Sequence, residues 1–341
     1  MKVLYAIQTT GNGHICRAKE MIPYLERRFQ FDVILSGPKN QFDLGYPIKN
    51  HFQGLTLYYT DSGAIHWIKT LFKNNFIRFV KDVLSLPIHE YDLVISDFEP
   101  VASWASKIRG VLCFGISNQI SLWQKKVPKP EKKYTSVVKC LKYFAPSDCE
   151  YGIHYQKFDK RIYAPILRSK VRTLVPATGG GIVVYLPAYH RNVIQTFLSD
   201  FPFVTWHVFT ATVQSTTQQG TLFLHPIDED NYLKRLAQAD GVITHAGFTT
   251  TAEALFLKKP LLVIPIRGQI EQQYNAAALK KLGVCVLKQL TASNSEAIAD
   301  WLQYPNRIQA TFENELKELV DRMAIDYIKI TFSEDTILNY P

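Results

Sequence analysis

Eight short apolar runs constrain the fold of this chain most strongly. Four lie in the first half of its 341 residues, at 2–7, 31–37, 92–98 and 111–116, and four in the second, at 182–187, 204–210, 241–247 and 260–266. They are rich in Val, Ile and aromatic residues and lack strict alternation, as is typical of parallel strands buried on both faces. Because helical patterns separate the runs, they predict an α/β fold with two doubly wound, Rossmann-like parallel sheets.

Proline and glycine residues mark the boundary between the two halves. They gather in APILRSKV at 164–171 and in VPATGGG at 175–181. Such clusters interrupt regular structure, so we place a first domain at 1–165 and a second at 166–325. The final segment, 326–341, is expected to return and pack on the first domain.

Composition narrows the class of protein. Lys and Arg exceed Asp and Glu by 39 to 30, which gives a net charge of +9 and a pI near 9.1. This excess favours an anionic partner: a phosphorylated ligand, a membrane surface or a nucleic acid. No apolar stretch approaches the roughly 18 residues that cross a bilayer, and the apolar run near the start is too short for a signal peptide. With five scattered cysteines and no CxxC pair, we expect a cytoplasmic protein without a zinc site.

The loop after the first apolar run contains two glycines, Gly11 and Gly13, in the sequence GNGH. Apolar residues at helical spacing follow it, so the glycines occupy a strand-to-helix turn at the carboxyl edge of a sheet, where ligands of open α/β folds bind. Cys16 stands where the dinucleotide fingerprint GxGxxG needs its third glycine. A nicotinamide cofactor is therefore disfavoured.

His14 ends this loop and begins the predicted helix. The helix dipole there disfavours an imidazolium, so the ring is suited to act as a general base; the alternative is a histidine that caps the helix or packs at the turn. Asp97, at the end of another predicted strand, could orient the imidazole. Alternatively, Asp97 or Glu99 caps the helix expected at 101–108.

The second half holds a phosphate-binding and polyol-binding pattern. The residues of HAGFTTT fall at a predicted helix N-terminus, where backbone N–H groups and hydroxyls can hold a diphosphate. Glu253 follows in the first turns of that helix and can accept from both hydroxyls of a ribose. After the next strand, Glu271, Gln272 and Gln273 form a polar cluster at the same sheet edge, which suits a polyol.

HAGFTTTAEAL, followed by KKPLLVIP and EQQYNA, resembles the donor signature of nucleotide-sugar-dependent glycosyltransferases of the GT-B type. These include the UDP-glycosyltransferases and the lipid II-forming transferase of peptidoglycan synthesis, and GNGH is a second shared feature. The resemblance implies these donor-site residues: His245, Gly247, Thr249 and Thr250 near the diphosphate, Glu253 on the ribose, and Glu271, Gln272 and Gln273 around the sugar. Phe248 and Thr249 replace the usual Trp and Asn, so the resemblance does not identify the donor sugar.

The resemblance also implies an architecture and a reaction. The first domain would bind an acceptor hydroxyl and the second a nucleotide sugar, with uridine as the expected base, across a cleft. His14, assisted by Asp97, would be the base of an inverting transfer, and no cofactor is expected. The helix start near Gly247, together with His245, would stabilise the leaving diphosphate electrostatically, so we expect no metal. Two alternatives stay open: a nucleotide-sugar 2-epimerase of the same architecture, and a catalytically inactive binding or scaffold subunit.

Residues 66–84 predict a basic amphipathic helix. Trp67, Phe72, Phe76 and Val80 are among the apolar residues of one face, while Lys69, Lys73, Arg78 and Lys81 lie largely off it. Such a helix could dock on an anionic membrane and lead to a lipid-linked acceptor, placing the protein peripherally on the inner face of the cell membrane. The alternative is an ordinary helix packed on the sheet. No recognition motif supports a nucleic-acid partner.

Overall fold

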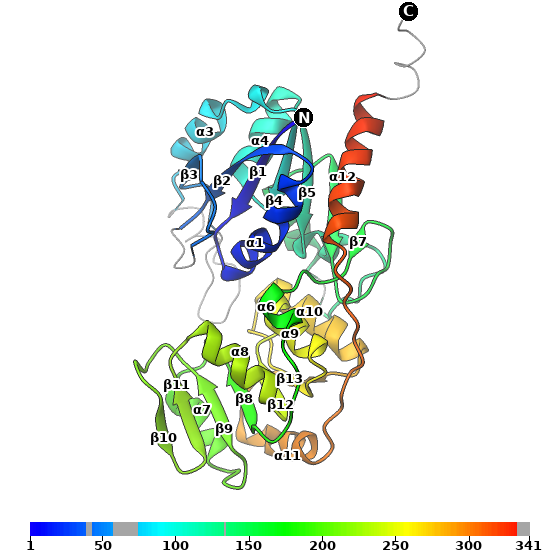
Figure 1. The fold of residues 1–341 in the computed structure, drawn as a ribbon. Helices are drawn as coiled ribbons and strands as arrows, with labels where there is room; N and C mark the ends of the chain where they lie inside the picture. The colour runs from blue at the N-terminus through cyan, green and yellow to red at the C-terminus, as the bar shows by residue number, and fades with distance from the viewer. Residues whose placement is uncertain (39–42, 57–73, 133, 333–341) are drawn as a thin grey trace, which may run out of the picture.

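Two seven-stranded sheets organise the chain, one in each half (Figure 1). They are seen in a computed structural model that describes residues 1–38, 43–56, 74–132 and 134–332. The predicted fold class, two parallel-sheet α/β domains, is confirmed.

The first sheet has the order β3-β2-β1-β4-β5-β6-β7, and its neighbouring strands all pair in parallel. Its strands are β1 (Lys2–Gln8), β2 (Gln30–Ser36), β3 (Asn50–Phe52), β4 (Leu93–Asp97), β5 (Leu112–Ser117), β6 (Cys149–Ile153) and β7 (Ile162–Tyr163). Alternate residues of β1 enter two different apolar clusters, Val3 and Tyr5 in one and Leu4 and Ala6 in the other. Both faces are therefore covered, which explains why the run KVLYAI is apolar throughout.

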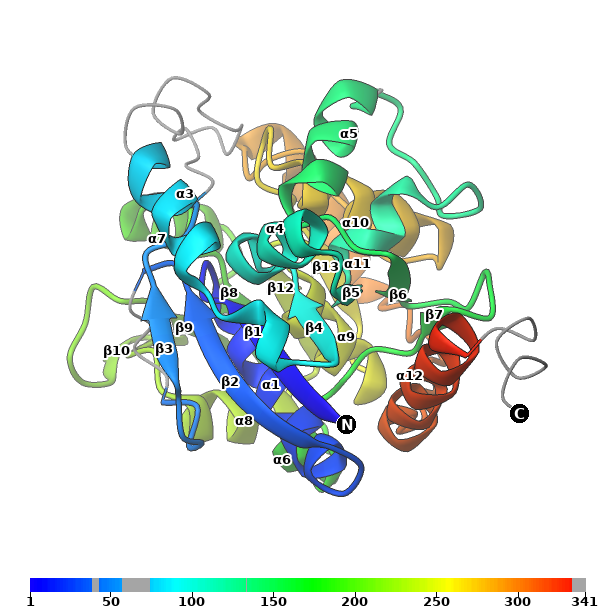
Figure 2. The same ribbon diagram turned by 90° about the horizontal axis from the view of Figure 1, so that it is seen from above.

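Helices cover both faces of this sheet (Figure 2). In chain order they are α1 (Asn12–Glu26), α3 (Phe76–Ser85), η1 (Ile88–Glu90), α4 (Pro100–Arg109), η2 (Gln119–Trp123) and α5 (Thr135–Phe144). Met21 and Leu25 of α1 pack on one face of the sheet. Val83 of α3 and Ala102 of α4 pack on the other.

The second sheet has the order β10-β11-β9-β8-β12-β13-β14. Its strands are β8 (Ile182–Tyr185), β9 (Trp206–Phe209), β10 (Thr217–Gln219), β11 (Leu222–His225), β12 (Gly241–Thr244), β13 (Leu261–Val263) and β14 (Cys285–Val286). The pairing is parallel except at the edge strand β10, which runs antiparallel to β11. The central strands are again buried on both faces.

The helices of the second half are α6 (Ser169–Arg172), α7 (Arg191–Leu198), α8 (Glu229–Gln238), α9 (Phe248–Phe256), α10 (Ile270–Lys281), η3 (Ala292–Asn294) and α11 (Ser295–Gln303). Residues of α8, α9 and α10 share one apolar cluster with α1 and the first sheet. Residues of α7 and α11 form a second cluster on the opposite face. One continuous core therefore connects the two domains.

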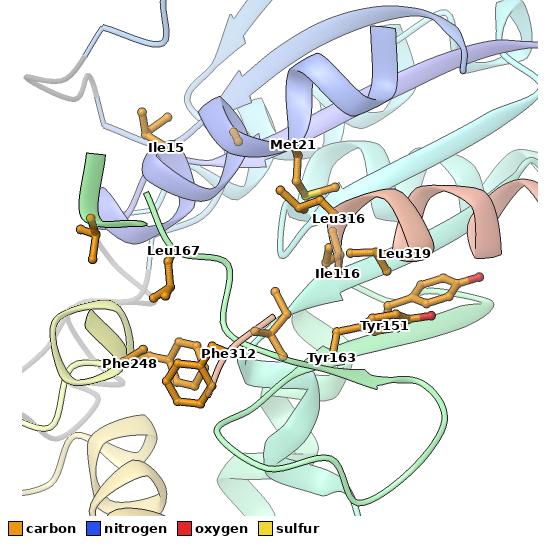
Figure 3. Packing of buried hydrophobic residues seen from close by; sticks show 14 of the residues in the cluster. Ile15, Met21, Ile116, Tyr151, Tyr163, Leu167, Phe248, Phe312, Leu316 and Leu319 are labelled. Carbon is orange, nitrogen blue, oxygen red and sulfur yellow. The ribbon is translucent and has the colours of Figure 1, made fainter. Parts of the chain in front are cut away.

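The last described helix, α12 (Leu316–Thr331), returns to the first domain. Leu316 and Leu319 lie among Met21 of α1 and residues of the first sheet (Figure 3). The buried carboxylate of Asp326 accepts a hydrogen bond from Tyr151 of β6 at 2.9 Å. The return was expected from residue 326, but it begins at Leu316, because the apolar face of α12 starts there; residues 333–341 lie outside the described part of the chain.

Other contacts also join the two domains. Phe98, Leu122 and neighbouring residues of the first domain form a small apolar cluster with Ile270 and Tyr274 of α10. Thr249 of α9 approaches the α1 loop so closely that a Cβ atom on Gly13 would lie 3.1 Å from its Oγ1. Within the described residues, none of the helices is long and apolar enough to cross a bilayer.

Candidate active site

His14 and Asp97 meet at the carboxyl edge of the first sheet. The strands β1 and β4 are parallel neighbours, with Ile7 paired to Asp97, so the loops that follow them leave at the same edge. Gly11 turns the chain into α1 with a φ of 119°, which glycine adopts readily. His14 Nδ1 lies 2.6 Å from Asp97 Oδ1, and both side chains are buried.

This contact fixes which ring nitrogen of His14 carries a hydrogen. Burial raises the pKa of Asp97, but the charges of Arg17 and His14 and their hydrogen bonds more than offset this, so its pKa is lowered. An ionised carboxylate only accepts, so Nδ1 of His14 must carry the hydrogen. The lone pair of the neutral ring then resides on Nε2, the tautomer that a general base needs.

Glu99 takes the capping role that was one alternative for Asp97. Its carboxylate accepts from the backbone N–H groups of Val101 and Ala102 at 2.6 and 2.7 Å, at the start of α4. Phe98, between the two acids, has a φ of 54°, an uncommon backbone conformation for a bulky residue. This turn directs Asp97 and Glu99 to different partners, and Phe98 stacks on His14 with ring centroids 6.5 Å apart.

A cleft of about 470 Å³ lies between the domains. The predicted site residues that line it are Gly11, Gly13, His14, Gly247, Thr249, Thr250, Glu253 and Glu271. Residues that the sequence did not single out also line it, among them Arg17, Asn118, Gln119, Arg168, Asp228 and Glu229. The two loops of the sequence signature thus face each other across one cavity.

The N-terminus of α9 opens onto the cleft. Gly247 is its N-cap and supplies no side-chain cap, so the first backbone N–H groups of the helix are left for other partners. Thr249 and Thr250 line the cleft in this first turn. Such a helix start suits the negative charge of a diphosphate.

His245 is placed differently from the expectation. Its Nδ1 donates to the carbonyl of Ile264 at 2.7 Å, and its Nε2 accepts from the backbone N–H of Ala188 at 3.2 Å. Burial lowers the pKa of His245, in keeping with a neutral ring. Among the described residues, His245 is not part of the cleft lining. Because both ring nitrogens bond to the backbone, His245 fixes the loop before α9. In this structure it is not available to a diphosphate.

Glu253 pairs with Arg168, which the sequence did not predict. Arg168 donates from Nε and Nη2 to the two carboxylate oxygens of Glu253 at 2.7 and 2.6 Å, and from Nη1 to Glu229 at 2.7 Å. Burial raises the pKa of Glu253, although Arg168 partly offsets it. Arg168 lies in APILRSKV, which suggested only a boundary, so the sequence carried no signal for this pair. Each oxygen keeps a further lone pair for a hydroxyl.

The polar cluster at the start of α10 divides into two parts. Glu271 accepts from Asn118 Nδ2 at 2.7 Å and from Gln119 Nε2 at 3.0 Å, both on the opposite domain. Gln272 instead accepts from the backbone N–H of Ile266. Gln273 donates to the carbonyl of the same residue. Glu271 is therefore the member that faces the cleft, while the two glutamines fix the loop before α10.

The described residues include no group of three or more His, Cys, Asp or Glu side chains that could hold a metal ion.

Comparisons with known proteins identify the family and agree with the fold. The family model "Glycosyl transferase family 1" matches residues 1–305. Phytolacca americana UGT2, solved with UDP-2-fluoro-glucose and pterostilbene, shares 14% identity and a TM-score of 0.60 over 96% of this chain and 99% of its own. A Polygonum tinctorium UDP-glucosyltransferase that glucosylates indoxyl shares 14% identity, a TM-score of 0.61, and 96% and 98% coverage.

A bacterial structure extends the match to the whole chain. S. aureus MnaA with UDP has 10% identity and a TM-score of 0.60, over 100% of this chain and 98% of its own. A comparison with curated protein sequences found no match. The family match covers both domains and both loops of the cleft, and the solved structures share the fold. The chain belongs to glycosyl transferase family 1 and is a glycosyltransferase with the GT-B fold.

Proposed function

We propose that this protein is an inverting glycosyltransferase that moves a sugar from a UDP-sugar to an acceptor hydroxyl. The observation that carries the proposal is the His14–Asp97 pair, with a contact of 2.6 Å, in the same cleft as the uncapped start of α9. The first supplies a base and the second a site for the leaving diphosphate. The domain of residues 1–165 would present the acceptor and the domain that follows would hold the donor.

In the proposed reaction the acceptor oxygen attacks the anomeric carbon from the side opposite the diphosphate. The new C–O bond forms as the bond to the diphosphate oxygen breaks, which inverts the configuration. The acceptor proton passes to His14 Nε2, and Asp97 stabilises the resulting imidazolium. Negative charge accumulates on the diphosphate and is stabilised by the N–H groups at the start of α9, with the hydroxyls of Thr249 and Thr250 close by.

The donor contacts follow the lining of the cleft. Glu253, fixed by Arg168, would accept from the ribose hydroxyls, and Glu271 from hydroxyls of the sugar. The uridine base is supported by neighbours whose structures contain UDP or UDP-2-fluoro-glucose. A thermal-shift panel tests the donor class, because a ligand at 100 times its dissociation constant stabilises the fold by about 2.7 kcal/mol. We expect UDP and UDP-sugars to stabilise the protein more than the corresponding ADP compounds.

A product assay separates transfer from the two alternatives. Incubation with UDP-N-acetylglucosamine alone would give a new sugar nucleotide if the protein were a 2-epimerase, whereas a transferase forms a glycoside only when an acceptor hydroxyl is present. UDP binding without turnover of any UDP-sugar, across a panel of phenol, sugar and lipid-linked acceptors, would instead indicate a binding subunit and overturn the proposal.

We further propose that the acceptor is lipid-linked and lies at an anionic membrane. Residues 66–73 of the predicted helix lie outside the described part of the chain. The helix α3 does not extend through the start of that prediction: it begins at Phe76, because Asn75 caps it by accepting from the backbone N–H of Arg78 at 2.9 Å. Phe79 and Val83 pack inward, while Phe76, Ile77, Val80 and Leu84 are 42 to 74% exposed on the outer face. Charged side chains flank this apolar face, with Arg78 and Lys81 on α3 and Lys107 and Arg109 at the exposed end of α4.

Arg109 also fixes the end of α3. Its guanidinium donates to the carbonyls of Val83 and Leu84 at 3.1 and 2.5 Å, next to the exposed Ile108. An exposed apolar face framed by cations suits the interface of an anionic bilayer. This supports a protein that works peripherally on the cytoplasmic face of a membrane.

A further inference from the structure

Arg17 is a buried cation directly beside the proposed base. It lies on α1 one turn after His14 and is 6% exposed. Its Nε donates to Asp97 Oδ2 at 2.7 Å and its Nη2 to Asp97 Oδ1 at 2.5 Å. This two-pronged contact fixes the plane of the carboxylate as well as its position.

The three groups form a balanced set of charges. Asp97 contributes one negative charge and Arg17 one positive charge, so the set is neutral when the imidazole of His14 is neutral. Arg17 Nη2 lies 2.8 Å from His14 Nδ1, so a second positive charge on the ring would face the guanidinium directly. If the charge of Arg17 were removed, a proton on His14 would become the nearest counter-charge for the buried Asp97.

Arg17 is itself held from the other side of the cleft. Its Nη1 donates to Asn118 Oδ1 at 3.3 Å, and Asn118 Nδ2 donates to Glu271 Oε1 at 2.7 Å. Glu271 belongs to α10 of the donor domain. Hydrogen bonds therefore run without a break from the base to the carboxylate that faces the donor sugar.

We propose that Arg17 is a positioning residue that keeps His14 neutral and correctly oriented, and that Asn118 and Glu271 couple this role to the donor domain. The inference rests on the proposed function, because it assigns Arg17 a role only if His14 is the base. Arg17 acts through Asp97 and takes no part in bond making or breaking.

The test compares two substitutions that remove different properties. Arg17→Gln removes the charge, and Arg17→Lys keeps the charge but loses the planar fork. Histidine labelled with ¹⁵N reports the protonation and tautomer of His14 by NMR at pH 7, with the His14→Gln spectrum assigning the signal. We expect a neutral ring with hydrogen on Nδ1 in the wild type and in Arg17→Lys, and a doubly protonated ring in Arg17→Gln.

Turnover supplies the second measurement, with UDP release from UDP-glucose and UDP-N-acetylglucosamine as the probe reactions. We expect Arg17→Lys to lower kcat by about 100-fold, as small displacements of catalytic groups do, with little change in UDP affinity. In Arg17→Gln the acid limb of the pH profile should move to higher pH, because the His14–Asp97 pair then takes up a proton more readily. The charged and titratable groups around the pair are Arg17 on α1, Tyr5 on β1 and, through Asn118, Glu271 on α10.

Asn118→Ala removes the hydrogen bonds of Asn118 to Arg17 and to Glu271 but keeps both contacts of Arg17 with Asp97. It should therefore lower kcat less than either Arg17 variant, with His14 still neutral. If Arg17→Gln does not fold, Arg17→Lys and Asn118→Ala still decide the matter through kcat. If His14→Ala still lowers kcat by about 100-fold or more, a neutral His14 in Arg17→Gln, or wild-type kcat in Arg17→Lys, would overturn the role of Arg17 alone. Unchanged turnover in His14→Ala would instead refute the proposed function.

Discussion

Tyr155 of the first domain and Thr251 of the second share a hydrogen bond of 2.7 Å between their hydroxyl groups, although both side chains are buried. Thr251 donates its own hydrogen to the carbonyl of Gly247 at 2.8 Å, so Tyr155 is the donor of the pair. The bond joins the start of α9 to the first domain directly beside the cleft.

Removing this hydroxyl should weaken the joint between the domains. Tyr155→Phe keeps the ring contact with Phe248 and deletes one buried hydrogen bond, so we expect the free energy of unfolding to fall by about 1 kcal/mol. Urea unfolding measures the change. Tyr304→Phe, whose ring is 72% exposed, is the matched control and should have no effect. Equal stability of the two variants would show that the bond contributes nothing.

The base should matter for turnover and little for donor binding. We expect His14→Ala to lower kcat by about 100- to 10,000-fold while UDP affinity is nearly unchanged, because general-base catalysis acts in the transition state. Asp97→Asn keeps the shape of the site but loses the charge that stabilises the imidazolium, so its loss should be smaller. Steady-state kinetics with a UDP-sugar and an accepted hydroxyl compound measure both. Wild-type turnover in His14→Ala would place the base elsewhere.

Glu253 should contribute to nucleotide affinity. Glu253→Ala removes a carboxylate that Arg168 has already oriented, and the loss of its charge-assisted bonds to the ribose should cost about 1.5 to 3 kcal/mol. Calorimetry with UDP measures this cost directly. Asp230→Asn, on the same helix as Glu229 but 81% exposed, is the control and should bind UDP normally. Unchanged UDP affinity in a folded Glu253→Ala protein would remove Glu253 from the donor site.

Glu99 should make stability depend on pH. Burial raises its pKa from 4.5 to about 7, although the N–H groups of Ala102 and Val101 oppose this. Between pH 4.5 and pH 7, Glu99 is therefore protonated in the folded protein and ionised in the unfolded chain. Its contribution to the free energy of unfolding is fully present below pH 4.5 and is lost as pH rises through 7. Each pKa unit corresponds to about 1.4 kcal/mol.

The measurement for Glu99 is a comparison of pH profiles. The free energy of unfolding of the wild type, minus that of Glu99→Gln, should fall by on the order of 3 kcal/mol between pH 4.5 and pH 8. Urea unfolding at several pH values across this range gives the difference. Parallel profiles for the two proteins would mean that Glu99 does not change its protonation on folding.

The apolar face of α3 should carry membrane binding. Wild-type protein should sediment with phosphatidylglycerol vesicles and not with phosphatidylcholine vesicles, and added salt should weaken binding because each Lys or Arg near the surface contributes about 1 kcal/mol that salt screens. Ile77→Ser with Val80→Ser should abolish sedimentation. Phe203→Ser, at a 77% exposed residue of the donor domain, should not. Equal sedimentation of the α3 variant and the wild type would point to a soluble acceptor.

The sequence predicted the features of the fold and the cleft that depend on local patterns and on the order of the strands. Buried apolar runs gave the two parallel sheets, and GNGH and HAGFTTT gave the two helix starts that line the cleft. Asp97 was placed near His14 because both follow strands that end at the same edge of one sheet. No local pattern told Asp97 from Glu99, however, since the unusual backbone of Phe98 decides which acid caps α4.

What the sequence could not predict depends on contacts between distant segments. Arg168 reaches Glu253 across 85 residues of chain, and Asn118 reaches Glu271 across 153. A motif carries no information on such partners, because they meet only when distant segments of the chain come together in three dimensions. His245 was assigned to the diphosphate from the family resemblance, because its hydrogen bonds to Ile264 and Ala188 are visible only in three dimensions.

The return of α12 makes the donor domain an insertion with two covalent connections to its neighbour. The outgoing and returning segments run side by side: the backbone N–H of Ala164 donates to Glu315 at 2.8 Å, and Arg172 donates to the carbonyl of Phe312 at 2.9 Å. Because the chain crosses between the domains twice at one place, both covalent connections fix the same end of the interface. The start of α9 and His14 are therefore held on facing sides of the cleft by the course of the chain as well as by the shared apolar core.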